Sequence, residues 1–394
     1  MDFLLTDEQR DIQRMTREFA QDKIAPQAAE WDSNGVFPLE VLAELGELGL
    51  MGVCAPEEYG GAGADFLSYI LVIEELSRAD AGLGVTVAVQ TSLATLPIVS
   101  FGNETQKRKW LPPLARGHVI GAYCLTEPGS GSDASALITS ARRDGDHYVL
   151  NGSKQFITNA GHAGVFVVFA RTERGSSGSS GISAFIVDAS SEGVVVGHEE
   201  KKLGLHSSST CNVVFDGVRV PASELLGDEG HGFAVAMHTL DGGRIGIAAQ
   251  AVGIAQAALD LALSYTRDRS QFGRAICEFQ ATQWKLADMD KDLEAARLLT
   301  YKAAWLKMQN KPYGVAGARA KLFASEIARR HTAEVVQLLG GYGYSKEFPA
   351  ERYFRDAKIT EIYEGTSEIQ RIVISRALLG HGRKPTPSGS GKVK

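Results

Sequence analysis

The stretch AYCLTEPGSGSDAS at residues 122–135 decides between two fold classes for the centre of the chain. Its letters GSGSDA match the GxGxxA form of a dinucleotide-binding fingerprint, and a strand-like run precedes them. A Rossmann site also requires a helix directly after these glycines, because the pyrophosphate lies on the N-terminus of that helix. Here Pro128 interrupts the motif, and residues 136–141 are strand-like. The stretch therefore favours a glycine-rich turn that holds a ligand, with a plain tight loop as the alternative.

The strand-like pattern extends in both directions from this turn. DGD at residues 144–146 and NG at residues 151–152 are hairpin signals. No segment of helical periodicity separates the strands, so we predict an antiparallel β domain over residues 118–229 and not a βαβ repeat. GSSGSSG at residues 175–181 is interpreted as a mobile hairpin loop, with an engineered linker as the alternative. The expected strands are residues 119–125, 136–141, 147–150, 155–158, 165–170, 182–187 and 212–214.

Helical periodicity occupies both flanks of this domain. At the start, Thr6 and Gln9 have the spacing of a capping box, and helices are expected over residues 1–117. After the β domain, apolar residues again recur at steps of three and four, which predicts a C-terminal helical bundle over residues 230–383. Residues 384–394 are rich in Pro, Gly, Ser and Lys and are predicted to form a disordered tail.

Length and composition limit the class of protein. With 394 residues the chain exceeds one ordinary core, and a prior of roughly 150 residues per domain predicts two or three domains. Apolar residues make up 44% and charged residues 22%, which is typical of a globular protein. The N-terminus shows no secretory or transit signal, and the hydrophobic stretches are interpreted as too short to span a bilayer. We therefore expect a cytoplasmic protein of bacterial type, or the processed form of an organellar matrix protein, with no membrane span.

The net charge and the spacing of the histidines argue against a nucleic-acid-binding protein and against a metal site. A net charge of −6 disfavours nucleic acid as a partner, because phosphate binding requires clustered Lys and Arg. The nine histidines show no HExxH or paired spacing, so no metal site is expected. The four cysteines are far apart and form no CxxC, which predicts buried free thiols in a reducing compartment.

The segment FITN at residues 156–159 contains an aromatic residue and, two positions later, a residue with a hydroxyl group. On a strand, Phe156 and Thr158 point to the same face. This pair suits a flat heterocycle with polar edges, because the ring can cover one face while the hydroxyl bonds an edge atom. An ordinary half-buried strand is the alternative.

The segment RDRSQFGR at residues 267–274 concentrates positive charge beside a glycine. Its guanidinium groups could bind a pyrophosphate through paired hydrogen bonds. A solvated charge cluster is the alternative.

The segment IYEGTSEIQ at residues 362–370 places one carboxylate, Glu364, between an aromatic residue and a glycine. Thr366 or Ser367 can cap the helix that follows, which leaves Glu364 in the preceding loop. A carboxylate beside apolar neighbours tends to have a raised pKa, which suits a general base near neutral pH. A simple helix start is the alternative.

Together these segments resemble the acyl-CoA dehydrogenase family over residues 5–380, nearly the whole chain. The matches are AYCLTEPGSGSDAS, RSQFG, QLLGGYGY and RDAKITEIYEGTSEIQR, in the family's order. LDGGRIGIAAQAVGIAQAALD at residues 240–260 is most similar to the short-chain, butyryl-type branch. The resemblance implies an α+β fold with an N-terminal helical domain, a middle antiparallel β domain and a C-terminal four-helix bundle. It also implies a homotetramer with one FAD per subunit.

The resemblance further implies which residues hold the cofactor. Phe156 stands where many members have Trp, so the aromatic ring is kept but the indole N–H is lost. Arg269, Phe272 and Gln280 would reach the FAD of a neighbouring subunit. The implied cofactor-binding residues are Tyr123, Leu125, Thr126, Ser132, Phe156, Thr158, Arg269, Phe272, Gln280, Gln337, Gly340, Gly341, Thr366 and Glu368.

The same resemblance makes Glu364 the catalytic base. The isovaleryl branch of the family places its base on another helix, at the position that matches Gly243 here, and glycine cannot act as a base. The residues implied to contact the acyl-CoA substrate are Ser132, Asp241, Arg244 and Gly365.

The implied reaction is the α,β-dehydrogenation of a saturated, short-chain acyl-CoA to the trans-2-enoyl-CoA, with electrons passed to an electron-transferring flavoprotein. The backbone N–H of Glu364 and a flavin ribityl hydroxyl would stabilise negative charge on the thioester oxygen. The alternatives are a flavin-dependent acyl-CoA oxidase, a branched short-chain acyl-CoA dehydrogenase, a monooxygenase on the same scaffold, and a helical binding protein without catalysis.

Overall fold

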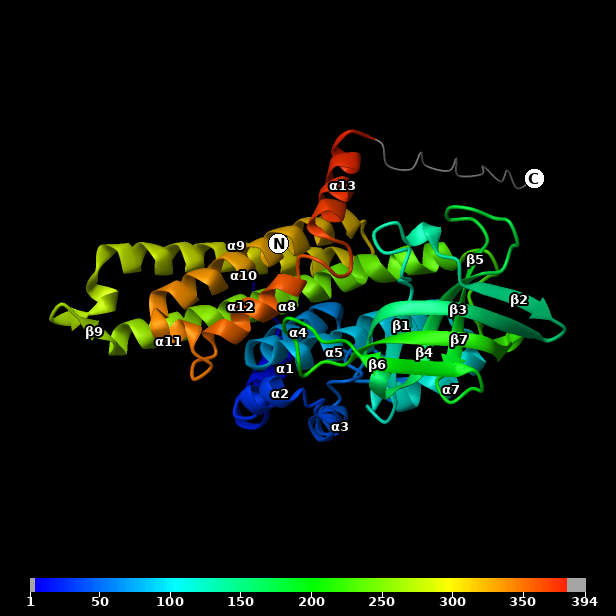
Figure 1. Ribbon diagram of the computed structural model, residues 1–394, viewed down its shortest axis with the longest axis horizontal. Helices are drawn as coiled ribbons and strands as arrows, with labels where there is room; N and C mark the ends of the chain where they lie inside the picture. The colour runs from blue at the N-terminus through cyan, green and yellow to red at the C-terminus, as the bar shows by residue number, and fades with distance from the viewer. Residues whose placement is uncertain (1–3, 381–394) are drawn as a thin grey trace.

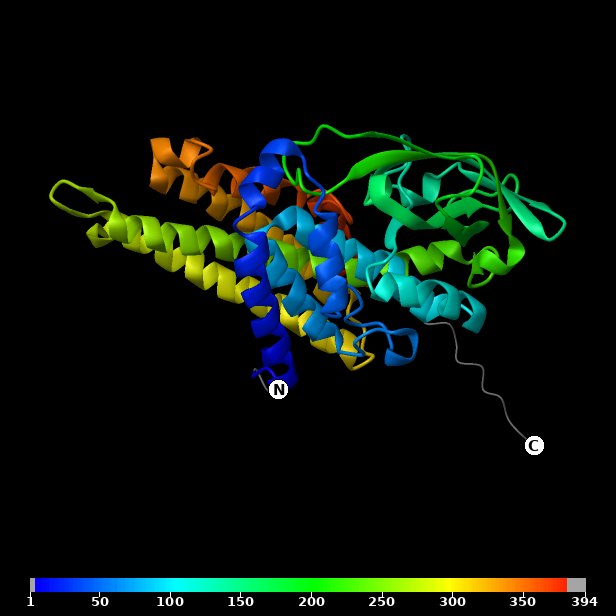
Figure 2. The same ribbon diagram turned by 90° about the horizontal axis from the view of Figure 1, so that it is seen from below.

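The computed structural model describes residues 4–380, so the predicted tail at residues 384–394 lies outside the described residues. The strands form one end of the elongated molecule, and the long C-terminal helices run from them to the opposite end (Figure 1). The N-terminal helices pack against the middle of these long helices, as the view from below shows (Figure 2).

Side-chain caps set the beginnings of several N-terminal helices. The predicted capping box is present, since Gln9 N donates to Thr6 Oγ1 and Thr6 N donates to Gln9 Oε1. Asp65 and Asp80 cap two apolar helices through their carboxylates, which accept from Ser68 N and Leu83 N. The helices are α1 (Asp7–Phe19), α2 (Ala28–Asn34), α3 (Leu39–Glu47), α4 (Phe66–Ala79), α5 (Ala81–Val89), α6 (Leu96–Phe101) and α7 (Glu104–Ala115), with π-helical segments Ala20–Ile24 and Gln90–Thr95.

Seven strands follow one another across the main sheet in the order β6-β7-β3-β2-β4-β5-β8, and β1 pairs with β4. Most of the pairings are antiparallel, as predicted. The strands are β1 (Ile120–Cys124), β2 (Ser140–Asp144), β3 (His147–Thr158), β4 (Ala163–Arg171), β5 (Ile182–Asp188), β6 (Val194–Glu199), β7 (Thr210–Pro221) and β8 (Leu225–Leu226).

The pairing of β1 with β4 is parallel, which the prediction of a purely antiparallel domain did not include. A single parallel bridge also joins Ser140 of β2 to Arg171 of β4. Parallel neighbours require a long connection. The glycine-rich turn, β2 and β3 together supply that connection between β1 and β4.

Two local predictions in this domain were wrong. The NG at residues 151–152 is not a hairpin turn, because β3 continues through it; a Cβ at Gly152 would lie 2.4 Å from Thr139 Oγ1, so close packing explains this glycine. Residues 136–141 are not one strand. Ile138 N and Thr139 N donate instead to the Glu127 carboxylate, which satisfies these groups outside the sheet.

Three long helices dominate the C-terminal part. The first of them, α8, packs against α4, α9 and α10, and α12 packs against α8 and α10. A small hairpin joins α8 to α9 at the far end of the molecule (Figure 1). The elements are α8 (Gly232–Asp268), β9 (Ser270–Gln271), β10 (Arg274–Ala275), α9 (Gln280–Met308), α10 (Gly314–Leu339), α11 (Gly341–Tyr344), α12 (Ala350–Ile359) and α13 (Ser367–Leu378).

Two helical segments are long and apolar enough to cross a membrane by length and composition, residues 81–101 and 232–268. The expectation that every hydrophobic stretch would be too short was therefore wrong. The most apolar windows of these segments are 89% and 83% buried inside the molecule. Buried core helices of this kind meet the same length and composition criteria, so the finding is weak evidence for a span.

All four cysteines are free, as predicted. Cys124 and Cys211 are buried, whereas Cys54 and Cys277 are only half-buried, so the prediction of burial holds for two of the four.

One buried ion pair ties the glycine-rich turn to the sheet. Lys154 is fully buried on β3, and its Nζ donates to Glu127 Oε1 at 2.8 Å and to Phe169 O at 2.7 Å. Although burial opposes the charged form, the Lys154 ammonium and the backbone donors hold the pKa of Glu127 below its usual value. The pair thereby fixes the start of the turn against β3 and β4.

Replacing Lys154 with Met should destabilise the protein by about 3–5 kcal/mol, because Glu127 would be left as an uncompensated buried charge. Urea-induced unfolding followed by circular dichroism measures this change. Lys291→Met is the matched control: it removes an exposed pair with Asp288, which solvent screens, and should change the stability far less. Equal effects of the two substitutions would contradict the assignment.

Candidate active site

Glu364 lies in the tight connection between α12 and α13. Its backbone is left-handed with φ +50°, and that of Gly365 has φ +94°. Thr366 caps α13, since its side chain accepts from Ile369 N as predicted. Gln370, on the first turn of α13, donates from Nε2 to Glu364 O at 3.3 Å and to Gly365 O at 2.8 Å. Left-handed backbone at a non-glycine residue stores strain, and such strain is concentrated at functional sites.

The Glu364 carboxyl group is directed at α8. A Cβ built on Gly243 would lie 2.0 Å from Glu364 Oε2, so only glycine permits this approach. Glu364 Oε2 is buried and has no hydrogen-bond partner among residues 4–380. Burial raises the pKa of Glu364 to about 7, against the positive charges of Lys321 and Arg244, which lower it. A carboxyl group that titrates near neutral pH can take up a proton from a ligand.

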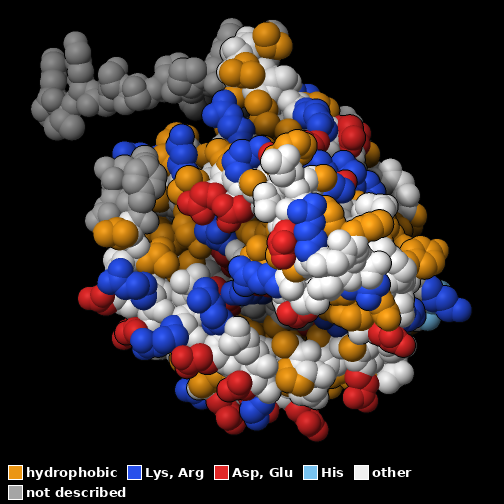
Figure 3. All heavy atoms as spheres, turned by 90° about the vertical axis from the view of Figure 1, so that its left-hand side faces the viewer, with side chains coloured by type: hydrophobic (Ala, Val, Ile, Leu, Met, Phe, Trp, Pro, Cys, Tyr) orange, Lys and Arg blue, Asp and Glu red, His pale blue; other side chains and the backbone are white. Residues whose placement is uncertain are grey.

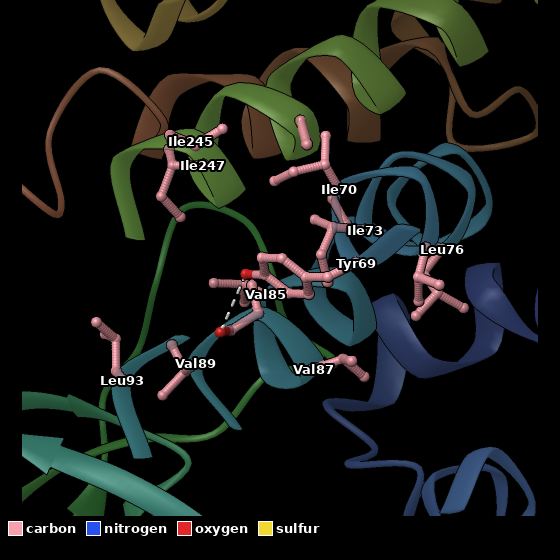
Figure 4. Packing of buried hydrophobic residues seen from close by; sticks show 14 of the residues in the cluster. Tyr69, Ile70, Ile73, Leu76, Val85, Val87, Val89, Leu93, Ile245 and Ile247 are labelled. Carbon is pink, nitrogen blue, oxygen red and sulfur yellow. Dashed lines mark hydrogen bonds between the residues drawn. The ribbon is translucent and has the colours of Figure 1, made fainter. Parts of the chain in front are cut away.

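Apolar side chains form the walls beside this carboxyl group. Leu93 Cδ2 would lie 3.2 Å from a Cβ on Gly243, next to Glu364. Figure 4 shows Leu93 in a cluster of buried hydrophobic side chains with Val89, Tyr69 and, on α8, Ile245 and Ile247. Burial raises the pKa of the Glu364 carboxyl group.

Arg244 and Asp241 lie three residues apart on α8, on either side of Gly243. Arg244 is buried, and its guanidinium donates to Asp241 Oδ1 at 2.6 Å. Arg244 Nε is buried without a hydrogen-bond partner in the described part of the chain. A buried donor in this state is available to a polar ligand.

The glycine-rich turn lies beside β3. Gln155 N donates to Thr126 O at 2.9 Å, which brings Thr126 beside β3 where Phe156 follows Gln155, and the half-buried Thr158 lies at the end of the same strand. The Phe156 ring is 64% exposed, and its backbone is left-handed with φ +58°. Ser132 is exposed on the same turn. An exposed ring and two hydroxyl groups in this arrangement suit the flat ligand that the sequence predicts.

Other residues predicted around this ligand have different environments. The side chains of Tyr123 and Leu125 are buried in the core, and Tyr123 Oη donates to Ala236 O at 3.4 Å. Gly365 is half-buried beside Glu364, and Glu368 is exposed on α13.

A second group of predicted residues lies at the opposite end of the molecule, at β9 and β10 (Figure 1). A cavity of about 580 Å³ there is lined by Arg269, Gly340 and Gly341, among others. Phe272 is 94% exposed nearby. Figure 3 looks onto this end, where Lys and Arg side chains lie among apolar ones. Gln280 and Gln337 are exposed. One chain therefore does not bring this group together with Thr126 and Phe156.

Sequence reasoning missed Lys321 and Gln370, the two buried side chains that bond the carbonyls of the Glu364 turn. A signal for Lys321 exists, because Gly317, Ala324 and Ala328 at helical spacing from it make up a buried face of α10. No group of three or more His, Cys, Asp or Glu side chains within residues 4–380 is placed to hold a metal ion.

Comparisons with known proteins identify the family of the chain. Family models match along the chain: acyl-CoA dehydrogenase N-terminal domain over residues 6–118, middle domain over 122–218 and C-terminal domain over 230–379. A short-chain specific acyl-CoA dehydrogenase of Clostridium acetobutylicum is 53% identical over 95% of this chain and 99% of its own length.

Two solved structures are similar throughout. Butyryl-CoA dehydrogenase from Megasphaera elsdenii has a TM-score of 0.94 and 50% identity, covering 96% of this chain and 100% of its own. A chain in a structure described as the electron transferring flavoprotein of Acidaminococcus fermentans has a TM-score of 0.95 and 52% identity, with the same coverage. The predicted resemblance and fold class are confirmed.

Glu364→Gln should raise thermal stability at pH 8, since the folded protein holds the Glu364 proton to higher pH than the unfolded chain does. Wild-type stability therefore falls as pH rises from about 4.5 to about 7, and the Gln variant lacks this loss. For a gain of roughly 1 kcal/mol in a chain of 394 residues we expect the midpoint about 1 °C higher at pH 8, with no difference near pH 4.5. Scanning calorimetry at both pH values measures it.

Glu361→Gln is the matched control three residues away. Despite partial burial, Lys358 and Arg329 lower the pKa of Glu361, so its ionised form stabilises the fold above the unfolded pKa. Its substitution should lower the midpoint at pH 8. A lower midpoint for Glu364→Gln as well would contradict the raised pKa of that carboxyl group.

Proposed function

Because the chain belongs to the acyl-CoA dehydrogenase family, we propose that it oxidises a saturated, short-chain acyl-CoA to the trans-2-enoyl-CoA, with Glu364 as the base. The observation that carries the role of Glu364 is its buried Oε2, which lies against Gly243 without a hydrogen-bond partner among the described residues. The short-chain preference is supported by the similarity to short-chain specific relatives.

The family is FAD-dependent, and the residues of this chain fit that cofactor. Phe156 and Thr158 offer a ring and a hydroxyl group beside Thr126, and Gly340 and Gly341 border open space in which a Cβ would meet no atom within 4 Å. We propose that the first three hold the flavin end and the two glycines the far end. FAD, when bound, supplies the acceptor for the hydride that leaves the β carbon.

The chain itself provides the proton acceptor and the placement of the thioester. Glu364 takes the α proton as the α C–H electron pair forms the new double bond. The backbone N–H of Glu364 would bind the thioester oxygen, where negative charge develops. Arg244, Asp241, Ser132 and Gly365 would contact the remainder of the acyl-CoA; the buried, unpartnered Arg244 Nε supports a polar ligand there.

The separation of the two predicted cofactor groups supports a homotetramer. Phe272, Trp284 and Tyr344 are exposed aromatic residues of the C-terminal part, and another subunit would cover them. In such an assembly Arg269, Phe272 and Gln280 would serve the FAD of a neighbour. We further propose an electron-transferring flavoprotein as the electron acceptor, supported by the similarity to a chain from a structure of such a protein, and a cytoplasmic or organellar-matrix location.

Anaerobic mixing of the purified protein with butyryl-CoA should bleach the flavin, and longer or branched acyl-CoAs should do so more slowly. Glu364→Gln should keep its FAD but lower the bleaching rate by about 10²–10⁴-fold, the usual contribution of a general base. Stopped-flow absorbance measures both. Absence of bleaching by any thioester, with FAD bound, would withdraw the proposed reaction.

Arg269→Ala should loosen FAD, because a paired hydrogen bond to its pyrophosphate would be lost. The flavin-to-protein absorbance ratio after gel filtration should fall at least several-fold. Arg14→Ala removes an equally exposed arginine far from this end and should leave the ratio unchanged. An unchanged ratio in both variants would refute the role of Arg269.

A further inference from the structure

A lysine side chain lies beneath the Glu364 turn. Lys321, on α10, is 1% exposed, and its Nζ donates to Gly365 O at 2.5 Å. Its neighbours on this face, Gly317 and Ala324, are buried small residues. A charged group on a buried face costs free energy unless nearby charge and hydrogen bonds compensate it. The hydrogen bond to the Glu364 turn therefore stabilises Lys321 at this buried position.

Lys321 shares its hydrogen-bond acceptor with Gln370. Gln370 is fully buried on α13, and its Nε2 reaches both Gly365 O and Glu364 O. A Cβ on Gly365 would lie 2.7 Å from Gln370 Nε2, so the packing leaves little freedom. Strained backbone persists only where its surroundings over-determine it. Two donors from two helices provide that constraint here.

The charges around Glu364 come from two helices. Lys321 on α10 and Arg244 on α8 are the cations that act on it, while the buried hydroxyl groups of Tyr69 and Tyr123 also face it. Arg244 already has a carboxylate partner, Asp241, at 2.6 Å. The strongest attraction that Lys321 experiences is to Glu364.

We propose that Lys321 is a positioning residue for the base: its hydrogen bond to Gly365 holds the Glu364 turn, and its positive charge favours the ionised Glu364 carboxylate. This inference rests on the proposed function, in which Glu364 takes the α proton. The role divides into a geometric part, which Gln370 shares, and an electrostatic part, which Gln370 cannot supply because it is neutral.

The protonation behaviour of the two groups supports the electrostatic part. Burial lowers the pKa of Lys321 to about 7, against the attraction of Glu364, which raises it. Burial raises the pKa of Glu364 to about 7, and Lys321 is the first of the charges that lower it. Each ionised group stabilises the other, so removal of the lysine charge should raise the pKa of Glu364 further.

The kinetic test compares Lys321→Gln, which can still bond Gly365 O, with Lys321→Met, which cannot. In both, the acidic limb of the pH profile for flavin reduction by butyryl-CoA should move up by about one pH unit, from a pKa of about 7 in the wild type, so the rate at pH 7 falls about five-fold. Lys321→Gln should regain most of the wild-type rate at pH 9, whereas Lys321→Met should stay slower at every pH.

Lys202→Met is the matched control. Lys202 is a half-buried lysine that donates to a loop carbonyl, Ser208 O, at 2.7 Å, and burial lowers its pKa as well. This variant should keep the wild-type pH profile. An unmoved acidic limb in both Lys321 variants would overturn the proposal, as would an equal shift in Lys202→Met.

A second measurement needs no turnover, so the two proposals can fail separately. At pH 7, where both groups are partly ionised, Lys321→Met should lower the thermal midpoint of the FAD-loaded protein, because it leaves a buried carboxylate unpaired. The double variant that also carries Glu364→Gln should regain most of the lost thermal midpoint. Additive effects of the two substitutions would overturn the pairing. If no thioester reduces the wild type, the proposed function fails, and this double-mutant comparison still decides the role of Lys321.

Discussion

The arrangement of the site depends on one close contact, that between the Glu364 carboxyl group and α8 at Gly243. No side chain fits between them, since even a Cβ would lie 2.0 Å from Oε2. The contact removes the carboxyl group from water and thereby raises its pKa toward neutrality. The backbone at Glu364 is left-handed, and the buried Gln370 donates a hydrogen bond to Glu364 O. The three C-terminal helices and the loop are thus positioned around one acid group.

The β domain is attached to the helices by similarly buried polar contacts. Asn159, at the end of β3, donates from Nδ2 to Thr86 O on α5 and to Gly121 O on β1. The Lys154–Glu127 ion pair fixes the glycine-rich turn to β3. Buried hydrogen bonds of this kind specify one arrangement, because leaving any of their groups unpaired is costly. The exposed ring of Phe156 is consequently presented at a defined place between sheet and helices.

The residues that the proposed cofactor would need together lie at opposite ends of the long axis of the molecule. Thr126 and Phe156 lie at the strand end, and Arg269 and Phe272 lie near the hairpin at the other end (Figure 1). The aromatic side chain of Phe272 at that end is 94% exposed. A second copy of the chain is the simplest occupant of that surface under the proposed assembly.

The amino-acid sequence alone determined the features that depend on neighbours a few residues apart. The capping box at Thr6, a cap of α13 at Thr366 or Ser367 and the change from helical to strand-like patterning follow from local hydrogen bonds and periodicity. Tertiary structure decided the rest: the parallel pairing of β1, the continuation of β3 through Gly152, and the placement of Lys321 under Glu364. These features join residues far apart in the chain, and a short window of sequence carries no signal for which distant backbone will approach. The charge on Glu364 belongs to this second class, because burial by α8 and the cations of two other helix positions, not the letters IYEGTSEIQ, set its pKa.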